Sequence, residues 1–151
     1  ADACGEVFPE TDVLLMAAAV GDYRVKHPSE IKRKRSAGGL TLELVENPDI
    51  LATLGARRRG NQVIVGFALE TNDAVRSGEA NRTAKGADLT VVNEAALAQD
   101  RETNTVTRVD GGQRRAYPEL SKPEVAGLIL DWVVERRRDG ETTPAGTPDH
   151  D

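Results

Sequence analysis

The sequence predicts an α/β fold: a Rossmann-like, mostly parallel sheet with helices on both faces and a β-hairpin near the C-terminal end. Three short apolar segments carry this prediction, at residues 12–18, 62–68 and 87–93. Each is a short, mostly apolar run, as expected for a strand that is covered on both faces. A helical segment at 73–85 joins the second strand to the third, and a strand–helix–strand unit implies parallel pairing with a right-handed crossover.

The segments around the first strand are less regular. Residues 20–39 are polar, basic and glycine-containing, which predicts a long functional loop. Residues 40–45 alternate apolar and polar side chains, as a half-buried strand does. Asn47 is expected to be the N-cap and Pro48 the first residue of a helix that runs through 50–59.

The C-terminal third changes character. Asp110-Gly111-Gly112 lies between two short strand-like runs and predicts a β-hairpin. Ser121 and Glu124 have the spacing of a capping box, which opens an amphipathic helix over residues 125–138. Residues 139–151 have no apolar pattern and are expected to form a disordered tail.

Composition limits the possible classes of protein. A chain of 151 residues suits one domain, expected over residues 1–138, and the net charge of −5 disfavours a general nucleic-acid binder. Cys4 is the only cysteine and the two histidines stand apart, so no disulfide and no metal site made of protein side chains alone is predicted. The longest apolar run, 13–20, is too short to span a bilayer, and no signal peptide is visible. We therefore expect a cytoplasmic protein that binds no membrane.

The predicted fold also predicts where a ligand binds. In an open parallel sheet, ligands lie beyond the carboxyl ends of the strands. Three such ends are found, at residues 16–22, 67–71 and 93–94, and each brings polar groups. Gly66 interrupts a bulky strand, which is unfavourable unless a close approach needs it. Taken alone, Asp22 could equally cap a turn and Phe67 could belong to the core.

The same segments resemble a known family. The matching strings are AAAVGDYR at 17–24, IKRK at 31–34, LTLELVENPDILATLG at 40–55, VGFALET at 65–71 and KGADLTVVNEA at 85–95. In sequence, order and spacing they are similar to phosphopantothenate–cysteine ligase, over nearly all of residues 7–135.

This resemblance implies a two-step ligation in coenzyme A biosynthesis. A nucleoside triphosphate, CTP in most bacterial members, activates the carboxylate of 4′-phosphopantothenate as an acyl-nucleotide with loss of pyrophosphate. The amine of cysteine then displaces the nucleotide monophosphate. Mg²⁺ accompanies the triphosphate. The family forms homodimers, for which the hairpin at 110–112 is a plausible pairing edge, and is often fused to a flavin-dependent decarboxylase.

The resemblance also implies roles for individual residues. The expected nucleotide-binding residues are Met16, Ala17, Ala18, Asp22, Phe67, Ala68, Leu69, Glu70 and Lys85. Lys32 and Asp22 are the expected catalytic residues, Asn93 is expected to bind substrate, and the basic loop 26–38 would fold over the phosphates.

Three departures from the family matter. The family's amino-terminal strand and glycine-rich turn, which would hold phosphates through backbone N–H groups, are missing ahead of Ala1. Glu30 and Asn81 stand where the family usually has lysines. The alternative is therefore a catalytically impaired nucleotide-binding paralogue that acts as a sensor or structural subunit. A dinucleotide-dependent oxidoreductase is disfavoured because the sequence has no G-x-G-x-x-G string.

Overall fold

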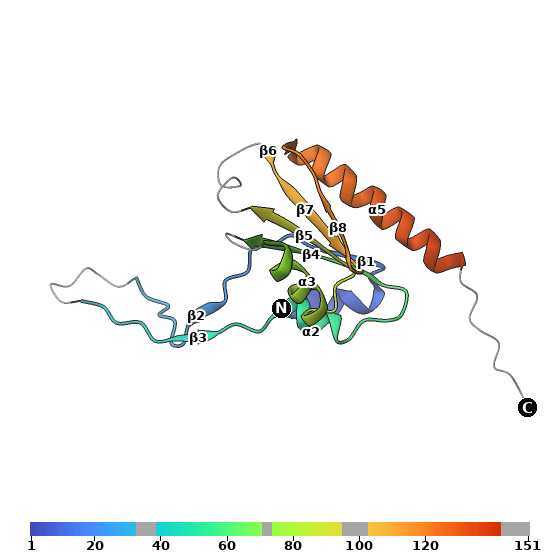
Figure 1. Ribbon diagram of the computed structural model, residues 1–151. Coiled ribbons are helices and arrows are strands. Elements are labelled where there is room, and N and C mark those ends of the chain that lie inside the picture. The colour runs from blue at the N-terminus through green and yellow to red at the C-terminus, as the bar shows by residue number, and fades with distance from the viewer. Residues whose placement is uncertain (33–38, 71–73, 95–102, 143–151) are drawn as a thin grey trace, which may run out of the picture.

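The computed structural model describes residues 1–32, 39–70, 74–94 and 103–142, and its centre is a five-stranded sheet (Figure 1). The strand order is β1-β4-β5-β7-β8, with bounds β1 Val13–Met16, β4 Val63–Glu70, β5 Leu89–Glu94, β7 Val106–Asp110 and β8 Gln113–Ala116. The pairs β1–β4 and β4–β5 are parallel, whereas β7 and β8 are antiparallel to their neighbours. The predicted parallel strands are confirmed. β1, however, which was expected to be a central strand covered on both faces, lies at the edge of the described sheet, and its Leu15 is 40% exposed.

Helices cover both faces of this sheet, as predicted (Figure 1). The long helix α5 (Lys122–Thr142) packs on one face. The opposite face carries α2 (Ile50–Gly55) and α3 (Ala74–Ala84). The N-terminal helix α1 (Asp2–Val7) and the 3-10 turn η1 (Phe8–Glu10) lie on the α2 side. Among the residues that the structure describes, no helix is both long and apolar enough to cross a membrane.

The central strand β4 explains the continuous apolar run in the sequence. Val63 and Val65 join the core under α5, while Ile64 between them joins the core under α2. Ile64 and Val65 have no exposed surface. Because alternate side chains enter two different cores, the strand is apolar from Val63 to Leu69, which is the pattern of a strand buried on both faces.

Helix α3 approaches the sheet closely at Gly78. A Cβ atom built at this glycine would lie 2.7 Å from Cγ2 of Val92 and 3.4 Å from Cγ2 of Val109. The absence of a side chain therefore lets α3 lie directly on β5 and β7.

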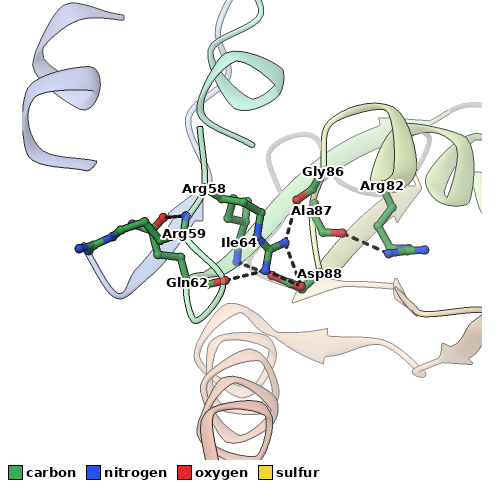
Figure 2. A network of polar contacts seen from close by, with 8 residues as sticks. All are labelled: Arg58, Arg59, Gln62, Ile64, Arg82, Gly86, Ala87 and Asp88. Atoms are coloured by element: carbon green, nitrogen blue, oxygen red, sulfur yellow. Dashed lines mark hydrogen bonds and ion pairs between the residues drawn. The ribbon is translucent and has the colours of Figure 1, made fainter. Parts of the chain in front are cut away.

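A polar network joins the amino-terminal ends of β4 and β5 (Figure 2). Oδ2 of Asp88 accepts from the backbone N–H of Ile64 at 2.9 Å, and Oδ1 accepts from both terminal nitrogens of Arg58 at 3.1 Å. Arg58 also donates to the carbonyls of Gln62 and Gly86. The half-buried guanidinium thus makes four hydrogen bonds to three residues, and it holds the turn after α2 against the start of β5.

The hairpin and the capping box are both confirmed. Gly111 and Gly112 have φ angles of 50° and 88° between β7 and β8, a backbone region that favours glycine. Ser121 donates its N–H and its hydroxyl to the Glu124 carboxylate, at 2.8 and 2.6 Å. The hydrogen bond from the Ser121 hydroxyl, followed by that from its backbone, lowers the pKa of the exposed Glu124 carboxyl. Trp132 of α5 donates to Asp110 at 2.6 Å, which ties the helix to the hairpin.

The predicted loop at 20–39 and the predicted strand at 40–45 are partly wrong. The loop contains a strand, β2 (Tyr23–Val25), which pairs antiparallel with β3 (Leu44–Glu46). This two-stranded ribbon extends away from the main sheet (Figure 1). Leu40, Leu42 and Leu44 are 51–62% exposed, so the alternating pattern does not mark a half-buried face. The pattern misled because an extended ribbon alternates in the same way whether or not anything covers it.

Three predicted helix boundaries also need correction. Asp49, not Asn47, caps α2, because the Asp49 carboxylate accepts from the N–H of Ala52 at 2.9 Å. The same helix ends at Gly55, before the arginines at 57–59. Helix α5 continues to Thr142, four residues past its predicted end at residue 138; residues 143–151 lie outside the described part.

Replacing Gly78 by alanine should lower the free energy of unfolding by about 1–3 kcal/mol, since the new methyl group overlaps Val92. Gly127→Ala in α5 is the matched control, because a Cβ there meets nothing within 4 Å. The control should keep or raise stability by up to about 1 kcal/mol. Urea unfolding measures both, and equal effects would contradict the close contact.

Asp88→Asn should lower the free energy of unfolding by about 1.5–3 kcal/mol. One carboxylate oxygen becomes an NH₂ group, which then faces either the Ile64 N–H or the Arg58 guanidinium. Urea unfolding at neutral pH measures the effect. Asp131→Asn, at an exposed position of α5, is the control and should be nearly neutral.

Candidate functional site

A cleft of about 900 Å³ lies at the carboxyl ends of β1, β4 and β5, where the sequence predicted a site. Its walls come from the three strands, from the loops after β1 and before α2, and from helices α2 and α3. Its lining is formed by residues 16–23, 46–51 and 66–69, together with Asn81, Lys85, Thr90 and Asn93. The strand register explains why these residues meet, because Met16 pairs with Gly66 and Gly66 pairs with Thr90.

One wall is a run of small residues directly after β1. Residues 17–22 are exposed and lead from Met16 to Asp22 without a bulky side chain except Val20. A flat ligand can therefore approach the backbone of this segment closely. Phe67, Ala68 and Leu69 of β4 form another part of the lining; Leu69 is exposed, and the half-buried Phe67 also packs against the core under α5.

The cleft brings together most of the predicted site residues. Met16, Ala17, Ala18, Asp22, Phe67, Ala68, Leu69, Lys85 and Asn93 all line it. Glu70 ends β4, and its side chain lies outside the described part of the structure. Lys32 is exposed and does not belong to the described lining. The rest of the predicted basic flap, residues 33–38, lies outside the described residues. The roles of these residues remain predictions.

The packing of α2 explains why residue 66 is a glycine, which the sequence alone did not show. A Cβ atom at this position would lie 2.9 Å from Cδ2 of Leu51. The glycine thus admits a leucine of α2 beneath the cleft, and the close approach predicted for a ligand is made by this side chain.

Lys85 is held at the cleft by α2. Its ammonium lies 3.5 Å from Oδ2 of Asp49, the residue whose other carboxylate oxygen caps the helix. At the other end of the same helix, a Cβ on Gly55 would lie only 2.2 Å from the carbonyl oxygen of Lys85. Both ends of α2 therefore fix the turn that carries the lysine.

Asn47 lines the cleft, whereas its sequence context predicted the N-cap of a helix. Its Nδ2 donates to the carbonyl of Gly21 at 2.7 Å, and its Oδ1 accepts from Arg24 at 3.1 Å. Its position in the family-like string at 40–55 was a usable signal, but the neighbouring Pro48 favoured a helix start. The side chain connects two loops instead.

The lining is more acidic than basic. Asp22, Glu46 and Asp49 contribute carboxylates, and Lys85 is the one lysine or arginine among the described residues of the lining. No group of three metal-binding side chains occurs in the described residues. Oδ1 of Asn93 is buried and has no hydrogen-bond partner within the described part, so a donor group on a bound molecule would satisfy it.

The fold and the cleft define an α/β protein with a ligand site at the carboxyl edge of a parallel sheet. Residues 1–136 match the family model described as the DNA/pantothenate metabolism flavoprotein C-terminal domain. The chain belongs to this family, which confirms the family resemblance in the sequence.

Individual relatives agree with this assignment. The chain is 35% identical over 133 residues to the coenzyme A biosynthesis bifunctional protein CoaBC of Bacillus subtilis, covering 85% of this chain and 32% of that protein. It is also 35% identical over 137 residues to a cysteine/cysteine sulfinic acid decarboxylase of an unknown prokaryotic organism, covering 88% of this chain and 38% of that protein. The chain thus spans about a third of the length of these relatives.

A solved structure gives the same result for the fold. The crystal structure of the C-terminal domain of a CoaBC protein superposes with a TM-score of 0.74 at 29% sequence identity. The match covers 91% of this chain and 61% of the other.

Two substitutions separate the roles of Asp49. Asp49→Ala should destabilise the protein by about 1 kcal/mol, because α2 loses its cap. Asp49→Asn keeps a capping oxygen and removes only the exposed ion pair with Lys85, so its effect should stay within about 0.5 kcal/mol. Thermal unfolding compares them. Equal losses would show that the charge, not the cap, supports α2.

Proposed function

We propose that this chain provides the nucleotide cleft of an enzyme that joins 4′-phosphopantothenate to cysteine through an acyl-nucleotide intermediate. The observation that carries the proposal is the gathering of the predicted nucleotide residues in one cleft at the ends of β1, β4 and β5. Family membership and the printed function of the CoaBC relatives, coenzyme A biosynthesis, support it. The ligation chemistry follows from the ligase resemblance in the sequence.

We propose CTP as the triphosphate. The small residues after β1 let a flat base and sugar lie against the backbone, with Phe67 and Leu69 on the other side and Asp22 available to a sugar hydroxyl or base amine. Among the described residues of the lining, Lys85 supplies the ammonium group that could contact a phosphate. Lys32 is proposed to stabilise the phosphate charge that develops during acyl transfer. Because Lys32 is not among the described lining residues, this role requires the segment before residue 33 to approach the bound phosphates.

Mg²⁺ fits this cleft as a companion of the triphosphate. Magnesium keeps several waters and usually takes one or two protein carboxylates plus substrate phosphates. Asp22 and Glu46 line the cleft and are carboxylates of that kind. The chain's own residues would position the two anionic substrates, which is most of what catalysis by proximity requires.

The ligase resemblance also supports a proposal for the acyl-substrate contact. Asn93 is proposed to bind the acyl substrate, because its buried Oδ1 lacks a partner among the described residues.

A homodimer is proposed, with β8 as one exposed edge, although Arg114 and Arg115 on this strand would repel a second copy. The exposed apolar side chains of the β2–β3 ribbon, including Tyr23 and Leu44, offer another surface. Association with a flavin-dependent decarboxylase and a cytoplasmic location complete the proposal.

The decisive experiment uses the full-length protein with CTP, Mg²⁺, 4′-phosphopantothenate and cysteine. We expect pyrophosphate release that requires phosphopantothenate, and a product with the mass of the cysteine adduct. CTP binding without pyrophosphate release would instead favour the second candidate, a nucleotide-binding paralogue. That candidate is favoured by Asn81, which lines the cleft where the resembled family has lysine.

Lys85→Gln should raise the Kd for CTP by about tenfold or more, because a hydrogen bond to a charged group contributes about 1.5–3 kcal/mol. Calorimetry on the full-length protein measures the change. Lys122→Gln, at an exposed position at the start of α5, removes the same charge away from the cleft and should leave the Kd unchanged. Equal Kd values for both variants would remove Lys85 from the nucleotide site.

A further inference from the structure

Asn47 joins two segments that both line the cleft. Its side-chain Nδ2 donates to the carbonyl of Gly21 and its backbone N–H donates to the carbonyl of Asp22, both at 2.7 Å. Its Oδ1 accepts from Arg24 at 3.1 Å, and Arg24 donates a second hydrogen bond to the carbonyl of Glu46 at 2.7 Å. One residue thus contacts three positions around Asp22.

The segment that Asn47 holds has little packing of its own. Residues 17–22 are all exposed, so side-chain burial does not fix their position. The other hydrogen bonds shown for this segment are local, from the Ala17 N–H to Leu15 and from the Val20 N–H to Ala18. The hydrogen bonds from the half-buried Asn47, together with the neighbouring pairing of Tyr23 with Glu46, therefore connect this wall of the cleft to the loop before α2.

We propose that Asn47 is a positioning residue for nucleotide binding. It holds the 17–22 segment, and with it the Asp22 carboxylate, at the distance from Phe67 that a bound nucleotide requires. This inference rests on the proposed function, because it assumes that the cleft binds a nucleotide. It assigns Asn47 no direct contact with the ligand.

The chemistry of the site explains why asparagine is needed. The side chain donates to a carbonyl on one side and accepts from a guanidinium on the other, and an amide can do both. Aspartate of the same size keeps the acceptor for Arg24 but sets a carboxylate oxygen against the carbonyl of Gly21. Alanine removes both bonds.

The test compares Asn47→Ala and Asn47→Asp with Asn61→Ala, an exposed asparagine at the other end of the sheet. The readouts are the Kd for CTP with Mg²⁺ by calorimetry on the full-length protein, the thermal midpoint, and amide hydrogen exchange. We expect both Asn47 variants to raise the Kd by roughly tenfold, since each loses hydrogen bonds worth about 1 kcal/mol. The backbone N–H of Asn47 should exchange faster, while the thermal midpoint stays near that of Asn61→Ala.

The outcomes separate this inference from the proposed function. If the unmodified protein binds CTP and both Asn47 variants bind it equally well, the positioning role is overturned and the proposed function stands. If the unmodified protein binds no CTP, the proposed function fails and the inference fails with it. Should Asn47→Ala not fold, Asn47→Asp decides on the same readouts, because it preserves the size and the contact with Arg24.

Discussion

The site depends on one constraint, the parallel pairing of β4 with β1 and β5. Parallel strands end at the same edge of a sheet, and the register places Met16, Gly66 and Thr90 in one row across it. All three residues line the cleft. A shift of one residue in β4 would exchange its two faces, because Ile64 and Val65 belong to different cores. The burial of β4 therefore fixes the geometry of the site.

The elements that the sequence predicted well are those whose burial dictates their composition. The apolar runs of β4 and β5 are covered on both faces, so their pattern can arise in few other ways. β1 has a similar run although it is an edge strand of the described sheet. The hairpin glycines and the Ser121–Glu124 capping box are equally local, since the turn or the cap needs those residue types at that spacing. Most of the cleft could be predicted because it follows from the ends of these strands.

The errors occur where tertiary contacts override a local pattern. Asn47 is a residue type that often caps helices. Its side-chain amide instead donates a hydrogen bond to the carbonyl of Gly21, a residue 26 positions away. Asp49, two residues later, takes over the cap. The exposed ribbon of β2 and β3 has the alternation of a half-buried strand with nothing covering it in the described structure. Gly66 and Gly78 likewise lie so close to the side chains of Leu51 and Val92 that a Cβ atom would overlap them, and no local sequence pattern reveals these contacts.

The charge of the cleft constrains how it can hold a triphosphate. Three carboxylates line it, from Asp22, Glu46 and Asp49, and Lys85 already pairs with Asp49. A polyanion entering such a site meets repulsion unless cations accompany it. Backbone groups and apolar walls can recognise the base and sugar without charge, whereas the phosphates need Mg²⁺ and basic residues beyond this lining. Nucleotide affinity should therefore depend steeply on Mg²⁺, and recognition of the base should depend on the shape of the two walls.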